Sequence, residues 1–260
     1  MTGEAAVLAR RFDVDDLRVE LATVPIEKTV LVQTMSDLAE TEEFIATAAG
    51  SGGTIAAVVG WIDLTAPDVS DTLGRLVGGN AGRLLVGVRH QLQDEDDAQW
   101  LLRDDVQRGL RAVDDVGLVF DLLVRARELP SAIEAARRLP GLSFVLDHAG
   151  KPPIADRNFE PWATLVASLA ANDNVSCKLS GLVTEATSEW AVADLVPYAQ
   201  HALGVFGWRR LMYGSDWPVC TLRTGYRGAY DVATELIADL SPSEQDAVLG
   251  DNAVTIYGLV

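Results

Sequence analysis

The chain has 260 residues, of which 48% are hydrophobic and 23% are charged, enough apolar material to bury one sizeable core. It carries 38 acidic and 21 basic side chains and a formal net charge of −17, which argues against nucleic acid and anionic lipid surfaces as partners. No apolar run is long enough to cross a bilayer, and the two cysteines have no CxxC spacing. We therefore expect a soluble protein with reduced thiols, working in the cytoplasm without a membrane partner.

The chain alternates between helical and strand-like segments. Residues 10–24, "RRFDVDDLRVELATV", have the spacing of a helix. Short apolar or β-branched runs follow, and we predict strands at 29–33, 54–62, 84–90, 117–124, 142–148, 175–181 and 210–216. After the first of them, Asp37 and Glu40 have the spacing of a capping box and Gly50 stands where a helix would stop. Apolar strands alternating with helices predict a single α/β domain over residues 1–260, a (β/α)₈ TIM-like barrel.

This predicted barrel lacks its first strand. A complete barrel of this kind begins with a strand and has eight, whereas here a helix comes first. The apolar patch at residues 5–9 is at most a makeshift strand. We therefore expect unpaired edges at strands 29–33 and 210–216, with lowered stability, unless residues 3–9 or a partner chain fill the seam. A homo-oligomer is one way of filling it.

Polar residues occur where the predicted strands end, which is where such barrels hold their reacting groups. They are Gln33, Trp61, Asp63, Arg89, His90, Asp147, His148, Lys178, Ser180 and Asp216. Two of the three histidines of the chain are in this set. The third, His201, lies in a helical stretch, and we interpret it as a packing or surface residue.

Structural roles compete with functional ones at two of these positions. Asp216 could cap the helix that follows, but Trp217 and Pro218 come next and do not resemble an ordinary first turn. His148 could be a core histidine, but the sequence "DHAGKPP" changes at once from strand to glycine and proline, as in a loop at a barrel mouth. We favour function for both.

Lys178 belongs to the polar face of its strand, together with Ser176 and Ser180. That face should point into the barrel, where a lysine needs an anionic partner. Asp121, the lone charge in "LVFDLLV", is a candidate partner. A structural ion pair and a contact to substrate are equally good interpretations.

Five segments carry a resemblance to a known family. In chain order they are "GVRHQLQDE", "GLVFDLLVR", "FVLDHAGKPPI", "VSCKLSGLVTEA" and "RLMYGSDWPVC". Together they resemble the amidohydrolase-related sugar-acid lactonases, typified by L-fuconolactonase and related to pyrone-dicarboxylate lactonase. The similarity runs from about residue 8 to "GDNAVTIYGL", which resembles the closing helix of the family.

The resemblance implies a distorted (β/α)₈ barrel of amidohydrolase type that hydrolyses lactones of sugar acids or related carboxylated rings, with or without a divalent metal. It implies that Asp216 is the base that activates water and that His148 is a metal ligand or a carbonyl-polarising group. It also implies that Arg89 and His90 contact the substrate.

The chain departs from this family at one motif. Members normally open with a strand that ends in a His-x-His pair, and no such pair occurs here. Either the start lies too far downstream or the chain is a real truncation that has lost metal-dependent chemistry. Only His148 and Asp216 remain as candidate metal ligands, against the three protein ligands of a catalytic zinc site. We expect a divalent metal such as zinc to be weakly held or absent.

These patterns predict a hydrolase that opens a lactone with water activated by Asp216. Arg89 and Lys178 can hold the carboxylate of an anionic or sugar-acid small molecule. The other predicted substrate contacts are His90, Gln33 and Trp217. The alternatives are a decarboxylase or lactone isomerase of the same superfamily, and an inactive truncated remnant.

Overall fold

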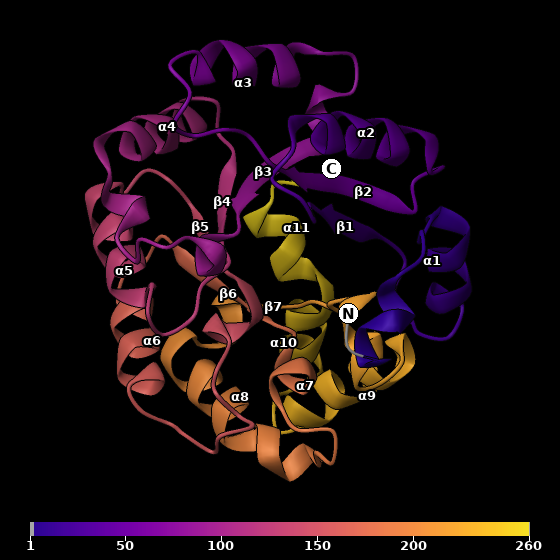
Figure 1. Cartoon of the computed structure of the whole chain (residues 1–260). Helices are drawn as coiled ribbons and strands as arrows, with labels where there is room; N and C mark the ends of the chain where they lie inside the picture. Colours follow the sequence, from indigo (N-terminus) through magenta and orange to yellow (C-terminus); the bar gives the residue numbers. More distant parts are fainter. Residues whose placement is uncertain (1–2, 260) are drawn as a thin grey trace.

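A curled parallel sheet forms the centre of the protein in a computed structural model that describes residues 3–259. Its strands follow one another in chain order. They are β1 (Thr29–Val32), β2 (Ile55–Gly60), β3 (Leu85–His90), β4 (Val119–Leu122), β5 (Phe144–Leu146), β6 (Val175–Leu179) and β7 (Leu211–Tyr213). Each predicted strand is present but shorter than predicted, and the predicted α/β barrel without its first strand is confirmed (Figure 1).

Helices accompany this sheet, most of them on its outer side (Figure 1). They are α1 (Val14–Leu21), α2 (Leu38–Gly50), α3 (Val69–Gly78), α4 (Asp104–Asp115), α5 (Leu129–Arg138), α6 (Trp162–Ala170), α7 (Leu182–Glu185), α8 (Val192–Phe206), α9 (Tyr226–Leu236), α10 (Pro242–Asp246) and α11 (Asn252–Ile256). Among the described residues, no helix combines the length and apolarity needed to cross a membrane.

Side chains alternate between the two faces of the sheet, as the strand period requires. Residues such as Phe120 and Val175 pack outward into the core under the helices. Val119, Val145 and Met212 point inward and form a second, smaller cluster inside the barrel. Polar residues that share the inward parity are therefore brought together within the barrel.

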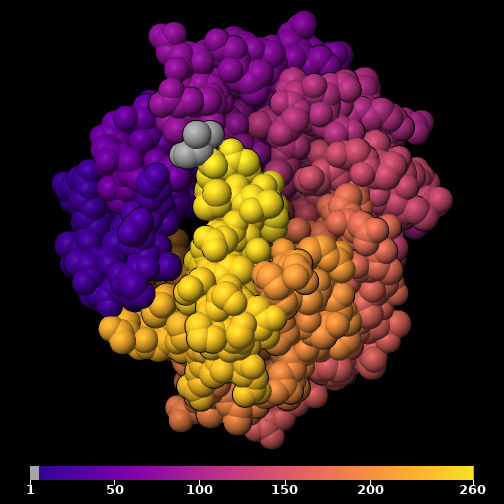
Figure 2. All heavy atoms as spheres, turned by 180° about the vertical axis from the view of Figure 1, so that it is seen from behind, coloured from indigo at the N-terminus to yellow at the C-terminus, as the bar shows by residue number. Residues whose placement is uncertain are grey.

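The C-terminal helix α11 lies where β1 and β7 stand apart. Tyr257 belongs to the inner cluster, and Ala253, Ile256 and Leu259 pack against it together with Val30 of β1. Figure 2 shows this C-terminal segment, in yellow, running across the back of the molecule. Within the described residues β1 and β7 do not pair with each other, so side-chain packing from α11 takes the place of strand pairing on the inner side of the seam.

The N-terminal residues do not fill the seam as a strand. Residues 3–8 form a short 3₁₀ helix (Gly3–Leu8), which lies beside the turn Val219–Leu222 that follows β7. The predicted makeshift strand at residues 5–9 was therefore wrong. The segment "GEAAVL" is rich in alanine, which favours helical conformations over strands.

The start of α2 also differs from its prediction. Asp37 caps the helix by accepting a hydrogen bond from Ala39 N at 2.9 Å. Glu40 does not complete the predicted capping box, because its carboxylate accepts from the backbone N–H groups of Thr34 and Met35, at 2.8 and 2.9 Å. The chain turns out of the sheet after β1, and the buried Glu40 supplies the acceptors that these backbone groups need. The helix ends at Gly50, as predicted.

Candidate active site

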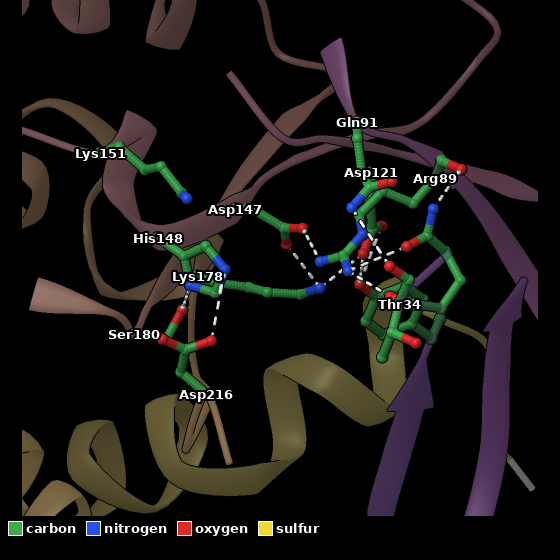
Figure 3. Close-up of polar contacts among 12 residues, drawn as sticks. Thr34, Arg89, Gln91, Asp121, Asp147, His148, Lys151, Lys178, Ser180 and Asp216 are labelled. Carbon is green, nitrogen blue, oxygen red and sulfur yellow. Dashed lines mark hydrogen bonds and ion pairs between the residues drawn. The ribbon is translucent and has the colours of Figure 1, made fainter. Parts of the chain in front are cut away.

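His148 and Asp216 face each other at the ends of β5 and β7 (Figure 3). His148 Nε2 lies 3.7 Å from Asp216 Oδ1, and each side chain is 13% exposed. Both residues have left-handed backbone conformations, with φ of 53° and 55°. Non-glycine residues in this region are strained and cluster at functional sites. The tertiary structure thus joins two residues that lie far apart in the sequence into one polar pair at the barrel mouth.

His148 is held from behind by Ser180, which follows β6. The Nδ1 atom of the imidazole lies 2.9 Å from Ser180 Oγ. Burial lowers the pKa of His148, and the attraction of Asp216 for the protonated ring only partly offsets this. The imidazole is therefore neutral at pH 7.

Asp216 does not cap the turn that follows it. That turn, Val219–Leu222, has no side-chain cap. Asp216 Oδ2 lies 3.4 Å from Thr184 Oγ1, and Oδ1 faces His148. The carboxylate is thus directed into the mouth, where it can contact a bound molecule.

Four charged side chains form a buried network behind this pair. Asp121 and Asp147 are fully buried, and the Lys178 ammonium group lies between them, 2.7 Å from Asp147 Oδ1 and in direct contact with Asp121. Arg89 Nη1 donates to Asp147 Oδ2 at 2.8 Å. The formal charges of the four residues cancel. The structural ion pair between Lys178 and Asp121, one of the two interpretations of the lysine, is confirmed.

The network shifts the pKa values of its members in opposite directions. Burial raises the pKa of Asp121 to about 6. The attraction of Lys178 for the carboxylate lowers this pKa in part, and the repulsion of Asp147 raises it further. Burial would also raise the pKa of Asp147, but Lys178 and Arg89 outweigh it and hold that pKa well below its usual range. Lys178 stays protonated, because the two aspartates overcome the cost of its burial and raise its pKa.

Gln33 joins this network through Arg89. The Arg89 Nη2 atom donates to the backbone oxygen of Gln33 and lies 3.2 Å from Gln33 Oε1. Gln33 is fully buried. Both Nη atoms of Arg89 therefore donate to groups of the protein, Nη1 to Asp147 and Nη2 to Gln33.

His90 lies outside the network, because successive strand residues point to opposite faces. Its Nδ1 accepts from Trp61 Nε1 at 3.0 Å, and its Nε2 lies 2.7 Å from Glu95 Oε1. Its ring stacks on Trp100 with the centroids 4.2 Å apart and the planes 3° apart. Both ring nitrogens are engaged, so the structure does not bring His90 to the pair of His148 and Asp216.

Trp217 and His201 have aromatic neighbours. Trp217 packs edge-to-face on Phe12, with the ring centroids 5.2 Å apart. His201 is remote from the mouth, where its Nε2 donates to Ala163 O at 2.8 Å and its ring packs on Trp162. The interpretation of His201 as a packing residue is confirmed.

Sequence reasoning missed a second set of charges at the mouth. Lys151 Nζ lies 3.7 Å from Glu185 Oε1, and Arg125 Nη1 lies 3.6 Å from Glu185 Oε2. Each of the three residues follows a different strand, β4, β5 or β6. Lys151 is part of the quoted "DHAGKPP" and could have been found from its position three residues after His148.

The side chains at the mouth do not make a complete zinc site. A catalytic zinc ion has three protein ligands and an open position. His148 and Asp216 are two donors, and within residues 3–259 no group of three or more His, Cys, Asp or Glu side chains converges to hold a metal ion. We therefore assign no catalytic step to a metal.

The fold is a (β/α) barrel with a polar pair at the ends of two strands, the position at which enzymes of this class hold their reacting groups. The model of the amidohydrolase family matches residues 1–259. The chain belongs to the amidohydrolase family, a family of hydrolases.

Individual relatives agree with this assignment. The chain is 37% identical to an L-fucono-1,5-lactonase of Burkholderia ambifaria over 252 residues, which cover 95% of this chain and 86% of that protein. It is also 37% identical to an L-fucono-1,5-lactonase of Burkholderia multivorans, over 97% of this chain and 88% of that protein.

A solved structure of a Burkholderia multivorans amidohydrolase with bound zinc has a TM-score of 0.92 and 36% identity, covering 99% of this chain and 92% of that one. A putative 2-pyrone-4,6-dicarboxylic acid hydrolase of Pseudomonas putida, 21% identical with a TM-score of 0.76, shares the fold over 98% of this chain and 93% of that one.

Proposed function

We propose that this protein hydrolyses lactones of sugar acids, with Asp216 as the base that activates water. One observation carries the proposal: His148 and Asp216 face each other 3.7 Å apart at a barrel mouth, in a chain 37% identical to two L-fucono-1,5-lactonases. A neutral imidazole and a carboxylate at this separation suit a carbonyl group and a water molecule bound side by side.

The two reacting groups have different tasks. Asp216 accepts a proton from water as the water oxygen bonds to the lactone carbonyl carbon. His148 donates a hydrogen bond to the carbonyl oxygen as negative charge develops on it. The bond between the carbonyl carbon and the ring oxygen then breaks, and the proton held by Asp216 passes to that ring oxygen. The product is an open hydroxy acid, which releases one proton to solvent near neutral pH.

Substrate contacts by Arg89, His90, Lys178, Gln33 and Trp217 stay predictions. Arg89 and Lys178 donate to Gln33, Asp121 and Asp147, so direct contact requires a substrate group to displace one of these bonds. Trp217, at the rim, is the candidate to exclude water from the bound lactone.

We further propose that a divalent metal such as zinc binds weakly, since His148 and Asp216 supply two donors and a catalytic site uses three. The two cysteines are buried and unpaired, which supports a cytoplasmic location. A homo-oligomer stays a prediction. The proposed partner is a small sugar-acid lactone, with no nucleic acid and no membrane.

Proton release from sugar-acid lactones, followed with a pH indicator, tests the function. We expect turnover by the wild-type chain and a loss of about two or more orders of magnitude in kcat for Asp216→Asn, because a positioned base has been removed. Asparagine has nearly the same shape, so the melting temperature should be unchanged. Asp63→Asn is the matched control, since Asp63 also follows a strand and, within residues 3–259, its carboxylate bonds to Thr65 nearby.

Product analysis separates the alternatives. Release of carbon dioxide would indicate a decarboxylase, and an isomeric lactone with no proton released would indicate an isomerase. No product from any lactone in the series would favour an inactive remnant. Wild-type turnover by Asp216→Asn would show that this carboxylate is not the base.

A further inference from the structure

The loop that follows β6 touches both members of the proposed catalytic pair. Ser180 Oγ lies 2.9 Å from His148 Nδ1, and Thr184 Oγ1 lies 3.4 Å from Asp216 Oδ2. Thr184 also donates to Gly181 O at 2.7 Å, which closes the loop on itself. One short segment thus contacts both the imidazole and the carboxylate. Figure 3 shows Ser180 beside the His148 ring, next to Asp216.

Ser180 is a buried residue beside His148. The residue is 7% exposed. The backbone of its neighbour Gly181 lies close to the His148 ring, since a β-carbon at Gly181 would lie 2.7 Å from the ring atoms Cγ and Nδ1. The hydroxyl oxygen is therefore held beside the imidazole.

The hydrogen-bond partners of this hydroxyl decide which ring nitrogen carries the hydrogen. A serine hydroxyl has one hydrogen to donate, and the imidazole has one N–H when neutral. Within residues 3–259, His148 Nδ1 is the one hydrogen-bond partner of Ser180 Oγ. If Nδ1 carried the hydrogen, the buried serine O–H would have no acceptor, which is costly. The favourable arrangement has the serine donating and Nδ1 accepting.

We propose that Ser180 is a positioning residue that fixes His148 as the tautomer with its hydrogen on Nε2. This proposal rests on the function proposed above and adds the reason why His148 can perform its task. The Nε2–H bond then points into the space beside Asp216, where the lactone carbonyl must lie to be attacked by water. In this state Nε2 is a hydrogen-bond donor to the substrate.

Nitrogen NMR of the imidazole rings tests the tautomer directly, since the chain has only three histidines. The other two serve as internal references. His90 accepts from Trp61 on Nδ1, and His201 donates from Nε2 to a carbonyl oxygen, so both should also carry hydrogen on Nε2. In metal-free buffer at pH 8 we expect three spectra of the same tautomer, with His148 assigned from a His148→Asn sample.

Ser180→Ala removes the donor and is expected to move the His148 Nδ1 resonance while leaving those of His90 and His201 in place. Its kcat should fall roughly ten- to hundredfold with little change in KM, because the lost orientation matters in the transition state. Ser180→Thr keeps the hydroxyl, and a cavity of about 20 Å³ beside Ser180 has room for part of the added methyl group, so spectrum and kcat should return toward wild type. Ser176→Ala, in the preceding strand β6, is the control.

Three results would overturn the proposal. One is a wild-type His148 with its hydrogen on Nδ1. Another is Ser180→Ala with an unchanged Nδ1 resonance and unchanged kcat. The third is a loss of kcat in Ser180→Ala that Ser180→Thr does not restore. The tautomer measurement needs no substrate. It therefore remains valid if the proposed reaction is wrong, and the two failures can be told apart.

Discussion

Tyr257, at the end of α11, lies with its hydroxyl oxygen 2.9 Å from each carboxylate oxygen of Asp121 in β4, although the two residues are 136 positions apart in the chain. Both are buried inside the barrel. Through Asp121 the C-terminal helix is connected to Lys178 and Asp147, and so to the strand that leads to His148. The segment that covers the open seam is thus also part of the polar network behind the site.

Tyr257→Phe should lower the free energy of unfolding by about 1–3 kcal/mol, since a buried carboxylate loses a hydrogen-bond donor. Chemical denaturation measures this. Tyr213→Phe is the matched control, because the Tyr213 hydroxyl is buried and has no hydrogen-bond partner within the described residues, so its removal should be neutral or stabilising. Equal losses in the two variants would show that the bond to Asp121 contributes nothing.

The pH dependence of stability should reveal the buried Asp121. Its pKa is raised from 3.8 to about 6 by burial, so the folded state keeps a proton that the unfolded state releases. The contribution of this group to the unfolding free energy is complete below the unfolded pKa and is lost as the pH rises through the folded pKa. The stability of wild type relative to Asp121→Asn should therefore fall between pH 4 and pH 6, by at most about 1.4 kcal/mol per pH unit.

Denaturation of both proteins at several pH values checks this, with the exposed Asp231→Asn as a control that should change little. An advantage of wild type that grows with pH would contradict the prediction. It would mean that the attraction of Lys178 outweighs burial at Asp121.

Gly181→Ala should damage activity more than stability. Gly181 has a φ of +65°, and a β-carbon there would lie 2.7 Å from the Cγ and Nδ1 atoms of the His148 ring. The ring must move, so we expect kcat to fall about a hundredfold, together with a stability loss of about 1 kcal/mol from the strained backbone. Gly117→Ala separates the two effects, because Gly117 also has a positive φ, of +72°, but has no atom within 4 Å of an added β-carbon. It should lose stability and keep its activity.

His90→Asn tests whether His90 supports the fold or binds substrate. Its bonds to Trp61 and Glu95 and its stacking on Trp100 predict a loss of about 2 kcal/mol in unfolding free energy, with kcat and KM within about threefold of wild type. Steady-state kinetics on the best lactone, beside thermal denaturation, measures both. A large rise in KM with unchanged stability would instead support the substrate contact that the sequence predicted.

The sequence by itself determined the repeated βα pattern, because strand and helix periodicities are local properties of the chain. It also determined which residues stand at strand ends, and so named His148, Asp216 and Lys178 as polar groups of one barrel mouth or interior. The inward direction of Lys178 followed from the two-residue period of its strand. The missing first strand was predictable in the same way, because the first periodic segment of the chain is a helix, whereas a complete barrel begins with a strand.

Only the tertiary structure decided which of these groups meet. His90 and Arg89 are neighbours in sequence, yet alternation sends one to Trp100 under the helices and the other to Asp147 in the barrel. Tyr257 reaches Asp121, and Glu185 reaches Lys151 and Arg125, across distances that no local pattern encodes. Glu40 does not complete the predicted capping box. Its carboxylate accepts from the backbone N–H groups of residues 34 and 35, because a buried N–H group needs an acceptor. Contacts between distant segments depend on how the sheet curls and which helix covers its seam, and that is a property of the packed molecule.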